Sequence, residues 1–90
     1  LESVASQVVR PPRVKQSRAA LECTVYEVVE LPVGTDGRKG RVVIGEVVGI
    51  HLDDDLIDDG RVDEARLRPL ARLGYFNYAA LGEILELRRP

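Results

Sequence analysis

A chain of 90 residues makes at most one small domain with a thin core, and its 44% hydrophobic and 31% charged residues are those of an ordinary globular protein. No apolar run approaches the roughly 20 residues that cross a membrane. A net charge of −2 provides no field for nucleic acid or an anionic membrane, so we expect neither as a partner. Cys23, the only cysteine, excludes an intrachain disulfide and a cysteine-based zinc site, which fits a reducing, cytoplasmic setting. The chain contains no methionine, which indicates that the natural polypeptide is longer.

Residues 1–18 are predicted to form an extended connector. Pro11 and Pro12 remove two backbone donors and bias the preceding residue toward extended geometry, which excludes regular helix there. The segment also carries four basic side chains, at Arg10, Arg13, Lys15 and Arg18. Because no aromatic residues lie between them, they favour a solvated linker over a phosphate-binding arm.

Residues 19–52 are predicted to form a β-hairpin. The first strand, 19–31, alternates between apolar and polar positions and is rich in β-branched residues. Residues 32–40 contain three glycines and an Asp-Gly pair, which are typical of a loop between strands. We expect Cys23 to be a buried small hydrophobe of the first strand rather than a catalytic thiol.

The return strand, 42–52, is apolar on both faces, which predicts burial on both sides. Gly45 and Gly49 lie on one face with His51, where missing side chains permit a β-bulge or leave room for another backbone or a flat ligand. Two interpretations of His51 stay open. It is either a core histidine satisfied by a backbone carbonyl, which we favour, or a ligand contact.

Residues 53–60 hold five aspartates, a composition that raises the question of a metal site. The alternate ligand positions and the closing glutamate of an EF-hand are absent. We therefore expect a solvated turn and no metal. Leu56 and Ile57 are predicted to form a small apolar plug within it.

A short helix is predicted over residues 64–68, ending at Pro69. Asp63 has the position and side chain of an N-cap residue. Arg66 and Arg68 lie where they can pair with the preceding aspartates. Residues 53–79 thus contain an acidic loop, this helix and an aromatic turn.

The aromatic turn, residues 72–78, contains three of the four aromatic residues of the chain. Its pattern is that of neither a helix nor a strand. Two interpretations are equally supported: a hydrophobic plug that closes the core, or a wall against a planar ligand, with Tyr75, Phe76 or Tyr78 as stacking groups and Asn77 as a polar contact. Residues 80–90 are predicted to form a last strand, over 80–87, and a tail.

In this order the segments resemble the C-terminal half of the flavin reductase-like family of FMN-binding split β-barrel proteins. The most specific pieces are IGEVVGIHLDDDLIDDGRVD and the spacing from RPLARLG to YAALGE, and the resemblance covers nearly the whole chain from Val8 onward. It implies a mainly β fold with one or two short helices, as the C-terminal part of a six-stranded Greek-key barrel.

The same resemblance implies an FMN cofactor near the interface of a homodimer, with NAD(P)H as a possible co-substrate. The residues that it places close to the flavin or the dimer contact are His51, Arg72, Leu73, Gly74 and Tyr78. It assigns no catalytic residue. The family pattern has a second glycine after Gly74, whereas this chain has Tyr75 and Phe76, a departure that bears on how closely the backbone approaches the flavin ring.

Two functions from different classes follow. In the first, the chain is part of an FMN-dependent oxidoreductase that transfers hydride or electrons between NAD(P)H and flavin or a small substrate, and the flavin performs the hydride chemistry. The 90 residues need not be active alone, because much of the family's flavin binding comes from its N-terminal half. In the second, they are a non-catalytic β-rich oligomerisation or binding module without flavin. A homodimer, or association with a missing N-terminal half, is expected because an open sheet leaves strand edges unpaired.

Overall fold

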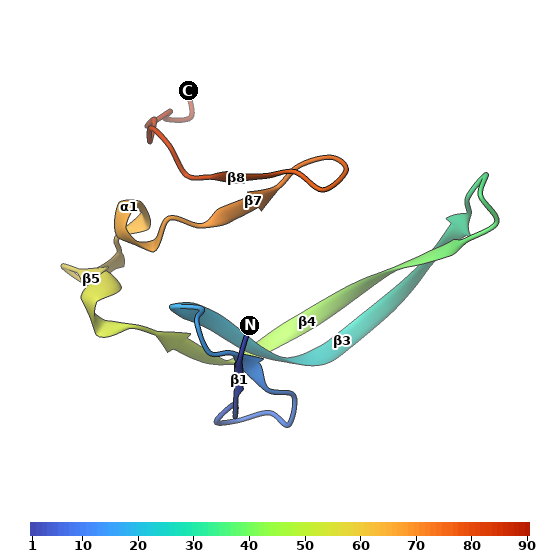
Figure 1. Cartoon of the computed structure of the whole chain (residues 1–90), viewed down its shortest axis with the longest axis horizontal. Coiled ribbons are helices and arrows are strands. Elements are labelled where there is room, and N and C mark those ends of the chain that lie inside the picture. Colours follow the sequence, from blue (N-terminus) through green and yellow to red (C-terminus); the bar gives the residue numbers. More distant parts are fainter. The chain divides into compact units, whose positions relative to one another are not determined.

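The computed structural model describes residues 1–90 and confirms a mainly β chain with two very short helices (Figure 1). The chain divides into two units, residues 1–52 and 53–90. The first contains β1 (Ser3–Val4), β2 (Arg13–Val14), β3 (Ala19–Val33) and β4 (Lys39–Leu52). The second contains the 3-10 helix η1 (Asp54–Leu56), β5 (Ile57–Asp58), β6 (Arg61–Val62), α1 (Glu64–Leu67), β7 (Leu70–Arg72) and β8 (Tyr78–Ala80).

Every ladder in the chain joins two consecutive antiparallel strands: β1 with β2, β3 with β4, β5 with β6, and β7 with β8. The chain therefore holds separate hairpins rather than a closed barrel. Neither helix has the length and apolar character needed to cross a membrane.

The predicted hairpin of residues 19–52 is the long ribbon of β3 and β4 in Figure 1. Its strands are longer than expected, because the loop tightens to a turn in which Gly34 N–H donates to the Arg38 carbonyl (2.9 Å). The Asp36 carboxylate accepts from Arg38 N–H (2.9 Å), and Gly37 adopts a φ of 77°. As in many turns, the aspartate side chain accepts a hydrogen bond from nearby backbone, and the glycine adopts the positive φ that the turn requires.

Burial on both sides of the return strand is wrong for this chain. Val43 remains 61% exposed and Ile44 42% exposed, on opposite faces of β4. A two-stranded ribbon has no second layer to cover either face unless another segment packs on it. The apolar character predicted from the sequence is real, but these 90 residues do not bury it.

The burial predicted for Cys23 is also wrong: its thiol is exposed, whereas the neighbouring Glu22 is only 6% exposed. The β3–β4 register shifts between Glu22 and Cys23, where the partners change from Gly49 to Val47. The unpaired residue of this bulge is Val48 on β4, so Glu22 and Cys23 still point to opposite faces of β3. The N-terminal segment covers β3 at Glu22, whereas Tyr26, farther along the same strand, is 71% exposed.

That segment is more structured than an extended connector, because β1 and β2 pair across the two prolines and Lys15 N–H donates to the Glu2 carbonyl (2.9 Å). Val8 lies against β4 at Gly49: a Cβ built on Gly49 would meet Val8 Cγ2 at 3.2 Å. Both uses expected for the missing side chain occur at Gly49, because the ladder shifts register beside it and Val8 takes the open space.

The Glu22 carboxylate anchors the N-terminal segment. Gln7 N–H lies 3.1 Å from both carboxylate oxygens, and the N–H groups of Val8 (2.6 Å) and Val9 (3.3 Å) donate to Oε1. These bonds hold the pKa of Glu22 below its ordinary value of 4.5, with Gln7 contributing most; burial opposes them, and the charge of Arg13 adds a small lowering. A charged acceptor facing three successive amides is a strong local clamp.

In the second unit, Leu56 is the only fully buried hydrophobic side chain of the chain, whereas Ile57 is 48% exposed. The predicted apolar plug is therefore Leu56 alone. The last strand is shorter than predicted, because β8 ends at Ala80 and residues 81–90 have no regular structure. Ala80 pairs with Leu70, and Pro69 before it has no N–H with which to extend the ladder.

Replacing Glu22 with glutamine should loosen the N-terminal segment, because a neutral amide oxygen accepts less strongly than a carboxylate. We expect amide hydrogen exchange at Gln7, Val8 and Val9 to accelerate by roughly fivefold or more. The matched control is Glu27→Gln on the same strand. Unchanged exchange in Glu22→Gln would show that the carboxylate does not hold the segment.

The same clamp has a defined pH dependence. Because the folded-state pKa of Glu22 is lowered, its stabilisation is present above the ordinary pKa of 4.5 and is lost as the pH falls below that value through the folded pKa. Acidification should therefore accelerate opening of residues 7–9 in the natural chain but not in Glu22→Gln, after correction for the intrinsic exchange rate. An equal acid response in both proteins would assign it to another group.

Candidate functional site

The candidate site is built on the β7–β8 hairpin, which brings together four of the five residues assigned by resemblance. Arg72 and Tyr78 are the last cross-strand pair of the ladder. Between them the chain turns through two backbone bonds, from Leu73 N–H to the Asn77 carbonyl (2.9 Å) and from Asn77 N–H to the Gly74 carbonyl (3.1 Å). The sequence pattern missed this hairpin, because its strands have only three residues each and the turn interrupts their alternation.

Arg72 lies across Tyr78. The guanidinium carbon is 5.4 Å from the centre of the tyrosine ring, which is cation–π distance, while Nη1 is 3.5 Å from the phenol oxygen. Nη2 donates a shorter bond, 2.8 Å, to the carbonyl of Tyr75. Arg72 thus ties the turn to the strand, and no carboxylate forms an ion pair with it. The site combines a positive charge with an aromatic ring that is 54% exposed.

Tyr75 and Phe76 form the outer end of this turn, with 90% and 94% of their surfaces exposed. They are therefore not a plug within this chain. Tyr75 has a φ of 57°, a conformation that costs a bulky residue on the order of 1–3 kcal/mol. Asn77, which the sequence analysis offers as a polar contact for a ligand, closes the turn through its backbone atoms. Nothing in the residue types alone indicated the positive φ of Tyr75.

A shallow apolar groove of about 280 Å³ runs beside the same ladder, between Pro69 and Gly82. Ala71, Ala79 and Ala80 line it, and their short side chains leave the strands accessible. Flat apolar walls next to a few polar groups are common in ligand sites.

His51 lies on β4, in the other unit, where it pairs with Ala20 and is half-buried. Its place on the apolar strand agrees with the sequence analysis. The structure brings Arg72, Leu73, Gly74 and Tyr78 into one hairpin of the second unit. His51 belongs to the first unit, residues 1–52.

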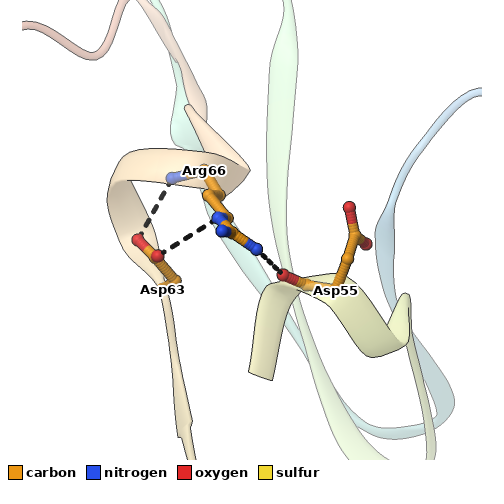
Figure 2. A network of polar contacts seen from close by, with 3 residues as sticks. All are labelled: Asp55, Asp63 and Arg66. Atoms are coloured by element: carbon orange, nitrogen blue, oxygen red, sulfur yellow. Dashed lines mark hydrogen bonds and ion pairs between the residues drawn. The ribbon is translucent and has the colours of Figure 1, made fainter. Parts of the chain in front are cut away.

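The acidic loop and the short helix are joined by Arg66 (Figure 2). Asp63 caps α1 as predicted, since its carboxylate accepts from Arg66 N–H at 3.2 Å and lies 3.6 Å from Arg66 Nε. Arg66 Nη1 reaches the Asp55 backbone carbonyl at 2.9 Å. The helix ends at Leu67, with Arg68 in the left-handed region as its C-cap, one residue before Pro69. Arg66 therefore joins the helix to the acidic loop through the Asp55 carbonyl, while the Asp63 carboxylate bonds it within the helix cap.

The aspartates themselves do not converge. The chain has no group of three or more histidine, cysteine, aspartate or glutamate side chains arranged to hold a metal ion. Glu22, which the sequence analysis left among the polar positions of its strand, is the acid with the most specific environment. A cue for it existed in the run of backbone N–H groups before the two prolines, which required acceptors from elsewhere.

No family model matches the chain. Among curated proteins, an uncharacterized protein of Halalkalibacterium halodurans is 40% identical over 92 residues, covering 100% of this chain and 43% of that protein. An uncharacterized protein of Aquifex aeolicus is 34% identical over 80 residues, covering 87% and 38% respectively. The chain therefore spans less than half the length of these relatives.

Two solved structures are similar in fold. The nitrilotriacetate monooxygenase component B from Bacillus cereus matches 94% of this chain and 42% of its own, with a TM-score of 0.81 and 34% identity. The 2-nitrobenzoate 2-nitroreductase NbaA from Pseudomonas fluorescens matches 99% of this chain and 44% of its own, with a TM-score of 0.76 and 26% identity. The chain is thus similar to about two fifths of each of two longer proteins.

Substituting Asp63 with alanine should destabilise α1 and the position of Arg66, because it removes both the helix cap and the ion pair to Arg66. Loss of a cap costs about 0.5–2 kcal/mol, and an exposed ion pair adds little to this. Amide exchange of Arg66 and Leu67 should accelerate accordingly. Asp58→Ala, in the acidic loop, is the matched control, and equal effects of the two substitutions would refute the specific role of Asp63.

Proposed function

We propose that this chain is part of an FMN-binding, flavin reductase-like oxidoreductase. The observation that carries the proposal is the structural likeness, at TM-scores of 0.81 and 0.76, to two proteins named for redox reactions, a monooxygenase component and a nitroreductase. The motifs described above add the resemblance to FMN-binding split β-barrels. Identity of 34% over 94% of the chain makes the first likeness more than a shared topology.

The β7–β8 hairpin fits a planar anionic cofactor. The exposed face of Tyr78 can stack against a flat ring, and Arg72 keeps guanidinium donors beyond those used within the turn. Leu73, which is 52% exposed, adds apolar surface beside Gly74, and a Cβ built on Gly74 would meet no atom within 4 Å. Backbone at this glycine is therefore open to close approach.

His51 is proposed as a second cofactor contact, supported by its position at the end of the GEVVGIH strand. The bound flavin would supply hydride transfer with NAD(P)H, and these side chains would bind and orient it. No residue of the chain is proposed as catalytic. The setting that we propose is cytoplasmic, as the single exposed cysteine favours.

The β3–β4 ribbon supports a further part of the proposal, that the chain works as a homodimer or packs on an additional segment of a longer polypeptide. A two-stranded hairpin alone is marginally stable in water. Val28, Val42, Val43 and Ile44 are all more than two fifths exposed on it. Covering such surface is the usual source of stability for paired strands.

The alternative is a non-catalytic β-rich module. It is favoured by one observation, that the chain has a single buried hydrophobic side chain, Leu56. Oligomerisation or binding would account for the exposed apolar ribbon without any cofactor. The two functions differ in whether flavin binds, which is measurable directly.

FMN titration separates the two functions. We expect the 90-residue chain to quench FMN fluorescence on binding, and Tyr78→Ala to weaken the affinity roughly tenfold through lost stacking and apolar contact. His51→Ala should weaken it as well. Tyr26→Ala, which removes an exposed tyrosine of β3, serves as the control. Absence of quenching would exclude FMN binding by this chain, and unchanged affinity in both site variants would remove the site assignment.

Sedimentation tests the association. The chain has a mass of 10.0 kDa, and we expect about twice that value in solution. Val43→Glu should shift the population toward monomer, because a charge would then be buried in the contact. Asp36→Glu, at the tip of the ribbon, keeps the charge and is the control. A mass of 10.0 kDa at all concentrations would rule out a homodimer of these residues.

A further inference from the structure

Tyr75 is held in a backbone conformation that does not suit it. It occupies the first central position of the turn closed between Gly74 and Asn77, with a φ of 57°. Turns with positive φ at that position prefer glycine, because a Cβ there is strained. Two other non-glycine residues have positive φ, Asp59 and Arg68. Aspartate tolerates this region, and Arg68 is a helix C-cap, whereas no such reason applies to Tyr75.

Within the chain, the Tyr75 side chain does nothing that offsets the strain. Its surface is 90% exposed, so the ring contributes almost no burial. The one contact that its residue makes is through the carbonyl, which accepts from Arg72 Nη2 at 2.8 Å. Any residue supplies a carbonyl, so glycine would serve the turn equally well. The reason for a tyrosine must therefore lie in something that its ring touches outside these residues.

The surroundings of the ring indicate the chemistry of that contact. Phe76 follows it and is 94% exposed, so two aromatic faces stand at the end of a turn that hydrogen bonds make rigid. Arg72, at the base of the turn, forms no ion pair and keeps donors for an anionic group. Aromatic faces beside an unneutralised guanidinium suit a ligand that is planar and negatively charged.

We infer that Tyr75 and Phe76 form a stacking tip for a planar aromatic anion, whose negative group Arg72 receives. This stacking tip extends the proposed function. It rests on the proposed function only where the ligand is identified as a redox partner. Two sources share the chemistry: FMN itself, and a small aromatic carboxylate that would meet the flavin as a substrate. Tyr75 and Phe76 therefore help to select the ligand. The second glycine of the family pattern has no side chain for that role.

The test compares the natural chain with Tyr75→Gly and Phe76→Ala, with Tyr26→Ala as the control for an exposed tyrosine elsewhere. FMN affinity is measured by fluorescence titration, and benzoate affinity by calorimetry or NMR. Cyclohexanecarboxylate and benzamide test the need for a planar ring and for a negative charge. Urea denaturation of each variant measures the strain.

We expect Tyr75→Gly to unfold at the same or a higher urea concentration, while its affinity for FMN or for benzoate falls about fivefold or more. The ligand whose affinity falls identifies the source. Phe76→Ala should act in the same direction, and the non-planar and uncharged probes should bind more weakly than benzoate.

Three results would overturn the inference: unchanged affinities for both ligands in Tyr75→Gly, a loss of stability in that variant, or no binding of either ligand by the natural chain. The proposed function fails separately. If benzoate binds through Tyr75 and FMN does not bind, the tip stands and the flavoprotein proposal falls. If FMN binds equally to the natural chain and to Tyr75→Gly, and the substitution leaves benzoate affinity unchanged, the stacking tip is refuted and the flavoprotein proposal stands.

Discussion

Antiparallel pairing of β3 with β4 is the interaction on which residues 1–52 depend. The two strands share a long ladder, interrupted by register shifts near Glu22, Val25 and Glu30. The N-terminal segment has its own short ladder, but it is held against this ribbon by the Glu22 carboxylate and by Val8 at Gly49. Backbone hydrogen bonds hold the ribbon, while its apolar side chains stay exposed. Such a hairpin is stable when something covers its faces, which is the physical basis for expecting a partner.

Local polar anchors replace a core elsewhere in the chain. Glu22 collects the amides of residues 7–9, Arg66 joins the acidic loop to α1, and Arg72 ties the aromatic turn to its strand. Each anchor is a charged group that bonds to backbone, and such bonds are stronger than those between neutral groups. They give each hairpin a defined shape, although Leu56 is the only hydrophobic side chain that is fully buried.

The Arg72–Tyr78 hairpin is where structure and proposed chemistry meet. The likeness to two redox enzymes extends over at least 94% of this chain, but over less than half of each neighbour. The candidate site therefore lies in a chain that is similar to only part of each neighbour. Tyr75 gives this hairpin an aromatic end and a strained backbone together, a combination that turn formation alone does not require.

The sequence by itself determined the elements that depend on local chemistry. Alternation and β-branched residues predicted the long hairpin, Asp36 and Gly37 its turn, and Asp63 and Pro69 the bounds of the short helix. It also placed Arg72, Gly74 and Tyr78 in one turn. These features follow from period, capping and backbone preference over a few residues, which a sequence displays directly.

Only the tertiary structure decided which side chains are buried and which atoms meet. Glu22 is buried and Cys23 exposed because residues 7–9 bond to the Glu22 carboxylate, a contact that the alternation of β3 does not display. The last strand ended at Ala80 because its partner ends beside Pro69. The strain at Tyr75 and the reach of Arg66 to a carbonyl depend on backbone positions. Residue types do not encode such positions singly, because they result from how neighbouring segments turn and pair.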